Sequence, residues 1–207
     1  MFLSILTAAL ACYFLGNHNG AVCVSHMLGD DVREHGSGNA GLTNFIRNYG
    51  AGRAALVIFI DAGKAILSCL LASCMLKPYG LALEGKVLGG LCTILGHVFP
   101  ALLGFRGGKG ILSGLFVALM VDWRIAAIIC AVFFTVYFMT RYVSLGSVLG
   151  ATAFGVCFVV FYYHNLWVCL GGILMSALTV FMHRGNIARL AKGQESKTDL
   201  FKRGVKK

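Results

Sequence analysis

Charged residues are scarce in this chain. Only 13% of its 207 residues are Asp, Glu, Lys or Arg, against roughly 25% in soluble domains. Hydrophobic residues make up 58%, and the mean hydropathy is +0.80. Residues 1–28 and 142–182 carry no Asp, Glu, Lys or Arg at all. Because a helix needs about 20 apolar residues to cross a bilayer, the composition predicts an integral membrane protein and excludes an ordinary soluble domain.

The motifs of several enzyme classes are also missing. The chain has no G-x-S-x-G elbow and no evident Ser/His/Asp triad. Its eight cysteines lie in apolar runs without a CxxC pair, so we predict no disulfide, no metal site and no cofactor. The Gly-Gly-Lys-Gly segment is not a Walker A motif, because Leu103 stands at the first required Gly and Gly110 follows the lysine. Hydrolysis of ATP or GTP is therefore not predicted.

The apolar segments predict an all-α, polytopic membrane protein with seven transmembrane helices. The expected ranges are 2–28, 54–76, 87–103, 110–121, 124–140, 145–163 and 165–182. Asp122-Trp123-Arg124 separates two short runs, which are either spans or re-entrant segments. The uncharged run 142–182 would measure about 60 Å as a single helix, so we expect it to turn once, at His164-Asn165.

The basic residues indicate the orientation. With seven spans, 14 Lys and Arg fall on one side of the membrane and 3 on the other. Because positive residues collect in the cytoplasm, the N-terminus is predicted outside and the C-terminus inside, with the chain in the cell membrane. We expect residues 1–195 to form one membrane-embedded domain and 196–207 a basic cytoplasmic tail. The net charge of +10 fits this topology and attraction to anionic lipid, so no nucleic-acid partner is predicted.

The polar, Gly-rich segments all fall on the predicted cytoplasmic side. Gly-rich loop 1 (residues 35–44) has three Gly within six residues, followed by Arg47. Such a loop turns its backbone N–H groups toward one point and binds anions, and Arg47 would add a bidentate phosphate partner. The alternative is a flexible loop that ends in a helix cap.

Gly-rich loop 2 (residues 104–110) follows His97 and Pro100 and contains Lys109. It is interpreted as a second phosphate-binding turn, the alternative being a basic loop that only sets topology. Ser147 lies in a third segment, where it is either a site residue or a helix cap. His183 and Asn186 begin a fourth segment, and their spacing of three places both on one face of a helix.

Asp61 and Lys64 are charged residues inside the second predicted span. Charges in such positions are costly and usually pair or serve function. Their i,i+3 spacing favours a structural ion pair near the polar site over a catalytic role.

The residues thus describe a site that holds phosphate and has no strong nucleophile. Direct transfer from an activated donor to an acceptor, catalysed by positioning and electrostatics, would suit it. Two other classes stay open at this point. One is a transporter or channel for phosphate-bearing anions, and the other is a non-enzymatic membrane scaffold.

Five sequence blocks between residues 35 and 195 together resemble the bacterial acyl-phosphate:glycerol-3-phosphate acyltransferase family, PlsY. In chain order they are Ser-Gly-Asn-x-Gly-x-Thr-Asn with Arg47, Gly-His-x-Phe-Pro, Phe-x-Gly-Gly-Lys-Gly, Ser-Leu-Gly-Ser, and His-Arg-x-Asn-Ile-x-Arg-Leu with Gly193 and Glu195. One block alone is weak evidence, whereas five in this order are specific. The resemblance implies seven transmembrane helices and an outside N-terminus, in agreement with the charge asymmetry.

The resemblance also implies a reaction, in which the 1-hydroxyl of sn-glycerol 3-phosphate attacks the carbonyl of a fatty acyl phosphate. The products are lysophosphatidate and inorganic phosphate, the partners include membrane lipids, and neither CoA nor acyl carrier protein is required. The implied catalytic residues are Ser37, Arg47, Lys109, Ser147, His183 and Asn186. The implied substrate-binding residues are Gly38, Asn39, Gly41, Thr43, Asn44, His97, Gly107, Gly108, Gly110 and Glu195. The proton acceptor is either the phosphate of the substrate or His183.

The chain departs from the family pattern in a few places. The clearest is Gly16-Asn17-His18-Asn19, which replaces a Gly-Ser-Ile-Pro turn, and the residues alone give no physical account of it. Others are Leu42 for Ala, Leu112-Ser113 for Ala-Thr, and Ala65 for Gly. His26-x4-Asp31 also matches the signature of a different glycerolipid acyltransferase family, but no Phe-Pro-Glu-Gly block follows, and we interpret that match as accidental.

Overall fold

The computed structural model describes residues 1–198, and over these residues the chain is helical, with no strand. Within residues 1–198 four helical segments are long and apolar enough to cross a membrane. They are Ala51–Tyr79, which contains α4 (Ala54–Leu76), Ala82–Leu103, which contains α5 (Ala82–Val98), α7 (Trp123–Thr140) and α8 (Val143–Tyr162). A fifth candidate is the bent pair of α9 (Leu166–Met182) and α10 (Arg184–Ala191), which turns by 54°. Two further apolar helices are shorter: α1 (Phe2–Gly16) and α6 (Ile111–Val121).

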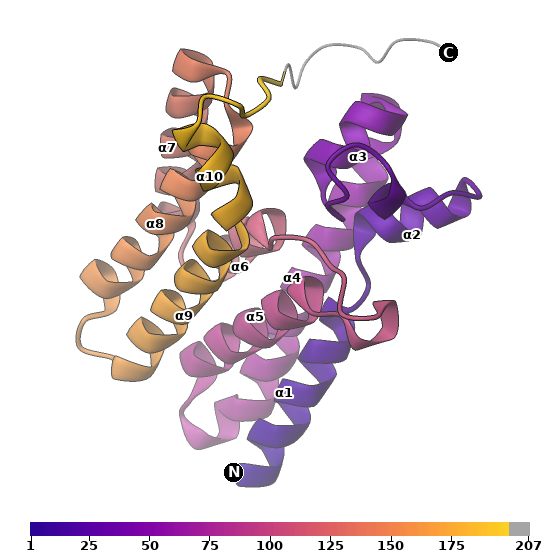
Figure 1. Ribbon diagram of the computed structural model, residues 1–207. Helices are drawn as coiled ribbons and strands as arrows, with labels where there is room; N and C mark the ends of the chain where they lie inside the picture. Colours follow the sequence, from indigo (N-terminus) through magenta and orange to yellow (C-terminus); the bar gives the residue numbers. More distant parts are fainter. Residues whose placement is uncertain (199–207) are drawn as a thin grey trace.

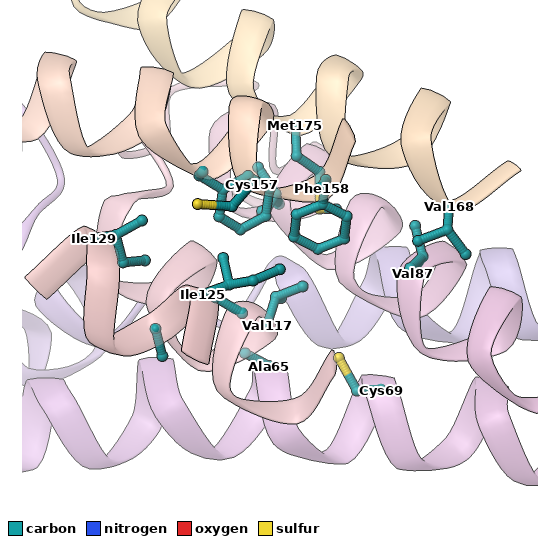
Figure 2. Packing of buried hydrophobic residues seen from close by; sticks show 14 of the residues in the cluster. Ala65, Cys69, Val87, Val117, Ile125, Ile129, Cys157, Phe158, Val168 and Met175 are labelled. Atoms are coloured by element: carbon teal, nitrogen blue, oxygen red, sulfur yellow. The ribbon is translucent and has the colours of Figure 1, made fainter. Parts of the chain in front are cut away.

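The helices form two groups, which Figure 1 shows in purple and in orange. In the first group α4 packs against both α5 and α1. In the second group α8 lies between α7 and α9. Contacts of α5 with α9 and of α6 with α4 and α5 join the two groups, and buried residues from α4 to α9 meet there in one apolar core (Figure 2).

Polar and apolar residues are distributed as expected for a protein surrounded by lipid. Large apolar side chains lie on the outside, among them Phe59 (73% exposed) and Trp167 (70% exposed). Asp61, Lys64 and His97 are buried instead. Since lipid offers no hydrogen bonds, polar groups at this depth must find partners inside the protein.

Most predicted helix ends agree with the structure to within a few residues. The split at Asp122 is confirmed, with the Asp122 side chain accepting a hydrogen bond from the Arg124 N–H at 2.9 Å. The turn at His164-Asn165 is also confirmed, since Asn165 caps α9 by accepting from the Val168 N–H. Helix α5 begins five residues earlier than position 87, where the sequence placed it.

The expectation of one continuous span over 2–28 is wrong. Helix α1 ends at Gly16, and the separate helix α2 (Gly20–Met27) begins after the break at residues 17–19. Figure 1 shows α2 leaving α1 at an angle, next to α3 (Leu42–Tyr49). Residues 2–28 carry no charge, so their hydropathy predicts a single span. In the structure Asn17 follows the end of α1 and Asn19 caps the start of α2.

The predicted basic tail, 196–207, lies outside the described residues from position 199 onward. Seven spans, with the N-terminus outside, stay a prediction. Helices α1 and α6, at about 22 and 16 Å, are each shorter than a hydrocarbon core of about 30 Å.

Candidate functional site

A cavity of about 810 Å³ opens between the two helix groups. Its wall combines loop 1 and α3 with the end of loop 2, the helices α6 to α9, and α10. One part is polar and the other is lined by apolar side chains. Such a cavity suits an amphipathic ligand.

Loop 1 is organised around the side chain of Asn44, the third residue of α3. The Asn44 carboxamide oxygen accepts from the Ser37 N–H at 3.0 Å. Its NH₂ group donates to the carbonyl oxygens of Val32, His35 and Asn39 at 3.0 to 3.1 Å. Asn44 therefore shapes the loop from within, although it also lies in the cavity wall. A direct contact of Asn44 with substrate stays a prediction.

Arg47 lies on α3, in the cavity wall. Its guanidinium donates to the hydroxyl of Thr198. The backbone N–H of Thr198 in turn donates to the Arg141 carbonyl at 3.1 Å. The segment after α10 thus connects α3 with the start of α8 beside the polar part of the cavity.

A chain of polar side chains connects loop 2 to α10. The Lys109 ammonium donates to the carboxamide oxygen of Asn186. The NH₂ group of Asn186 donates to Glu195 at 2.7 Å, and Arg189 donates to the other oxygen of the same carboxylate at 2.7 Å. Glu195 therefore bonds to Arg189 directly and to Lys109 only through Asn186. Lys109, Arg189 and Arg47 give this end of the cavity an excess of positive charge.

This environment changes the acidity of Lys109. Burial disfavours its ammonium form, and the positive charges of Arg189 and Arg47 act in the same direction. Glu195 opposes them, and the pKa of Lys109 is lowered to about 8. Lys109 is thus charged at neutral pH but can lose its proton at mildly alkaline pH.

His183 lies just beyond the end of α9, in the cavity wall. Its Nδ1–H donates to the Thr179 carbonyl at 2.8 Å, because a carbonyl oxygen can only accept. This bond leaves Nε2 as the unprotonated nitrogen. Burial, together with the charge of Lys109, lowers the pKa of His183 to about 4, so the imidazole is neutral at pH 7.

The predicted ion pair of Asp61 and Lys64 is confirmed. The Lys64 ammonium lies 2.7 Å from Asp61 Oδ1 and 2.7 Å from Nδ1 of His97. Asp61 and His97 both line the cavity, whereas Lys64 lies behind them. The pair therefore lies beside the polar part of the cavity, as predicted, while its structural rather than catalytic role stays a prediction.

The apolar part of the cavity lies among α6, α7, α8 and α9. Its wall includes Leu115, Ile129, Phe133, Phe154 and Met175. Sequence reasoning missed this chamber, because every predicted span is apolar and nothing marks which faces would enclose a space.

The structure brings together most of the predicted site residues. The cavity wall contains Ser37, Asn39, Gly41, Thr43, Asn44, Arg47, His97, Lys109, Gly110, Ser147, His183, Asn186 and Glu195. Gly38, Gly107 and Gly108 do not line it and lie in the supporting backbone of the two loops. Their proposed roles, like those of the lining residues, stay predictions.

Several lining residues were absent from the predicted set, namely Gly36, Asp61, Ser144, Arg189 and Ser196. Ser144 and Arg189 lie inside two of the five sequence blocks, so the sequence carries a signal for both. Asp61 is predicted as a member of a structural ion pair, and Ser196 as the first residue of the tail.

The remaining sequence expectations concern cysteines, metals and the His26 signature. All eight cysteines are free, and no cluster of His, Cys, Asp and Glu within residues 1–198 could hold a metal ion. His26 and Asp31 approach to 3.4 Å, but neither lines the cavity.

The fold and site define a helical integral membrane protein with a cavity that is cationic at one end and apolar at the other. A family model described as glycerol-3-phosphate acyltransferase matches residues 6–193. The chain therefore belongs to the glycerol-3-phosphate acyltransferase family, as its five sequence blocks predicted.

Individual relatives agree with this assignment. A glycerol-3-phosphate acyltransferase of Finegoldia magna is 36% identical over 95% of this chain and 97% of its own length. One of Neisseria meningitidis is 33% identical over 93% of this chain and 96% of its own. A crystal structure of PlsY, an integral membrane glycerol 3-phosphate acyltransferase in its glycerol 3-phosphate form, superposes with a TM-score of 0.86. It is 31% identical, and the match covers 96% of this chain and 100% of that one.

Proposed function

We propose that this acyltransferase takes its fatty acyl group from an acyl phosphate and transfers it to the 1-hydroxyl of sn-glycerol 3-phosphate. The hydroxyl oxygen bonds to the carbonyl carbon, and the bond from that carbon to the phosphate oxygen breaks. Inorganic phosphate leaves, and lysophosphatidate is the other product. The mixed anhydride is already activated, so neither CoA nor acyl carrier protein takes part.

The observation that carries this proposal is the joining of a cationic pocket to an apolar chamber within one cavity. A fatty acyl phosphate has the same division, with a charged head and an apolar chain. The names of two solved structures add support, because they describe PlsY in a glycerol 3-phosphate form and in a lysophosphatidic acid form.

The residues divide between the two substrates. Loop 1, with Ser37, Gly38, Asn39, Gly41 and Thr43, faces the acyl phosphate headgroup, and Asn44 fixes the loop. Arg47 and Lys109 bind phosphate charge. The glycerol 3-phosphate is positioned by Ser147, His183, Asn186 and Glu195. Gly107, Gly108 and Gly110 shape loop 2, and His97 orients it.

Catalysis on this proposal is mainly electrostatic. The leaving phosphate accepts the proton of the attacking hydroxyl, and the neutral His183 orients the acceptor through Nε2. If His183 were the base instead, an acidic limb near its lowered pKa of about 4 would disappear in His183→Gln. Persistence of that limb in the variant supports substrate phosphate as the acceptor.

The topology is part of the same proposal. Seven spans, with the N-terminus outside and loops 1 and 2 facing the cytoplasm, place the cavity where soluble glycerol 3-phosphate is available. The lipid product leaves into the inner membrane. The asymmetry of Lys and Arg supports this orientation.

The test is phosphate release by purified protein in detergent, given acyl phosphate with and without glycerol 3-phosphate. Release should depend on both substrates. Lys109→Ala and Arg47→Ala should each slow it by about 10²- to 10³-fold, the usual effect of removing a group that stabilises charge in the transition state. Lys77→Ala is the matched control, because Lys77 is exposed at the other end of α4.

A transporter would behave differently. Uptake of glycerol 3-phosphate into sealed vesicles without phosphate release would contradict the acyltransferase proposal.

A further inference from the structure

The break at residues 17–19 connects the two Gly-rich loops. Asn17 and Asn19 are almost fully buried. The Asn17 carboxamide oxygen accepts from the backbone N–H of Leu102 at 3.0 Å, just before loop 2. The Asn19 NH₂ group donates to the carbonyl of Ala40, inside loop 1, at 2.9 Å. One short segment thus contacts both loops.

A buried cation fixes the break itself. The Lys64 ammonium donates to the His18 carbonyl at 2.9 Å and to the Gly16 carbonyl at 3.3 Å. Its partner Asp61 accepts from the Gly20 N–H at 3.1 Å. The carbonyl at the end of α1, the His18 carbonyl within the break and the first N–H of α2 therefore have partners on α4, which lets the chain turn inside the membrane domain.

Loop 1 and loop 2 also contact each other at Ala40, whose carbonyl oxygen accepts the hydrogen bond from Asn19. A Cβ on Gly108 would lie 2.6 Å from the Ala40 carbonyl oxygen and would collide with the His97 ring. The Gly108 N–H donates to the His97 carbonyl at 3.0 Å. The residues on either side of Ala40, which are Asn39 and Gly41, line the cavity. The Ala40 carbonyl is therefore the place where loop 1 rests on loop 2.

We propose that Asn19 is a positioning residue for acyl transfer, which sets loop 1 against loop 2 through the Ala40 carbonyl while Asn17 anchors the approach to loop 2. This inference rests on the proposed function, because it assigns loop 1 to the acyl phosphate headgroup. It also accounts for the sequence Asn17-His18-Asn19, which departs from the family pattern.

The side chain of Asn19 has two separable contacts. Its oxygen caps α2 by accepting from the Val22 N–H at 3.1 Å, and its NH₂ group contacts Ala40. Asn19→Ser keeps a capping oxygen and removes only the donor to Ala40. Asn19→Asp keeps both the shape and the cap and places an oxygen against the Ala40 carbonyl, so it serves as a second variant should the Ser protein not fold.

His18 is the matched control. It lies between the two asparagines, is exposed, and its ring Nδ1 lies 3.3 Å from the Leu15 carbonyl oxygen. His18→Gln leaves the backbone carbonyl that Lys64 needs. We expect its kinetics to match those of the unaltered protein.

The experiment measures initial rates of phosphate release in detergent, varying each substrate in turn. We expect Asn19→Ser to raise the KM for acyl phosphate by roughly tenfold, the effect of one lost buried hydrogen bond. The KM for glycerol 3-phosphate should change less than about twofold, because the contacts of α10 are untouched. Asn19→Asp should show the same split between the two KM values, with a larger rise for the donor.

Three results would overturn the inference. They are an equal rise of the two KM values, a fall of kcat alone, as when part of the protein is merely unfolded, and kinetics of Asn19→Ser equal to those of His18→Gln. In each case the unaltered enzyme still releases phosphate, so the proposed function stands. If the unaltered enzyme releases none, the proposed function fails and the inference falls with it.

Discussion

Lys109 illustrates at the scale of a residue how the surroundings change the pKa of a group that we propose binds phosphate. It is partly buried, bonded to Asn186, and close to two guanidinium groups. The sequence predicted its role from the Gly-Gly-Lys-Gly pattern. It could not predict the lowered pKa, because Arg189 and Glu195 approach it only after α10 folds back.

The pH dependence of activity follows from that pKa. We expect kcat/KM for the phosphate substrates to fall as the pH rises through about 8, since Lys109 loses its positive charge there. Lys109→Arg should be less active but should lack this alkaline limb, because Arg stays protonated to a pKa above about 12. The same limb in both proteins would show that another group controls it.

The need for glycine at position 108 follows from close packing, because a Cβ there would collide with the His97 ring and the Ala40 carbonyl oxygen. We expect Gly108→Ala to lower kcat/KM at least tenfold, because its methyl group would push loop 2 away from His97 and the Ala40 carbonyl. Gly63→Ala is the control, since a Cβ at that helical position meets nothing within 4 Å. Equal activity of the two variants, measured as phosphate release, would argue against tight packing of the loops.

At the scale of elements, the site depends on α10 as much as on the Gly-rich loops. Its Asn186 accepts a hydrogen bond from Lys109 of loop 2, and its Arg189 is connected to Asn186 through Glu195. The i,i+3 spacing of His183 and Asn186 predicted one shared face, and both residues do line the cavity. The bend of 54° that brings them there follows from packing and is not visible in the sequence.

Glu195→Gln tests the coupling between α10 and loop 2. Glutamine still accepts from Asn186 but removes the negative charge that raises the pKa of Lys109. The alkaline limb of kcat/KM should therefore shift to lower pH. An unshifted limb would mean that Glu195 does not act on Lys109.

The break between α1 and α2 depends on the buried pair of Asp61 and Lys64. Asp61→Asn leaves the Lys64 cation buried without its partner, and we expect a loss of about 3–5 kcal/mol in the free energy of unfolding. The double variant Asp61→Leu with Lys64→Met should recover only part of this loss, because it removes both charges but leaves the Gly20 N–H and the His18 carbonyl without partners. Thermal unfolding in detergent measures the effect, and a single variant as stable as the unaltered protein would contradict it.

At the scale of the whole molecule, the sequence predicted an all-helical membrane protein and most helix ends. Uncharged apolar runs and polar turns, such as those at Asp122 and Asn165, are local features of the sequence. The helix ends predicted from these two turns are confirmed. The break at residues 17–19 and the apolar chamber were missed. Both depend on partners far away in the chain, such as Lys64 for the break and Met175 for the chamber wall.

On our proposal, one cavity binds both substrates and transfers the acyl group of a fatty acyl phosphate to glycerol 3-phosphate. In the most direct measurement, the purified protein is incubated with labelled glycerol 3-phosphate and one donor, which is acyl phosphate, acyl-CoA or the acyl thioester of acyl carrier protein. Lysophosphatidate and phosphate are quantified in the same samples. The account predicts equal amounts of both products with acyl phosphate and no lysophosphatidate with either thioester. Lysophosphatidate formed from a thioester, or none formed from acyl phosphate, would contradict it.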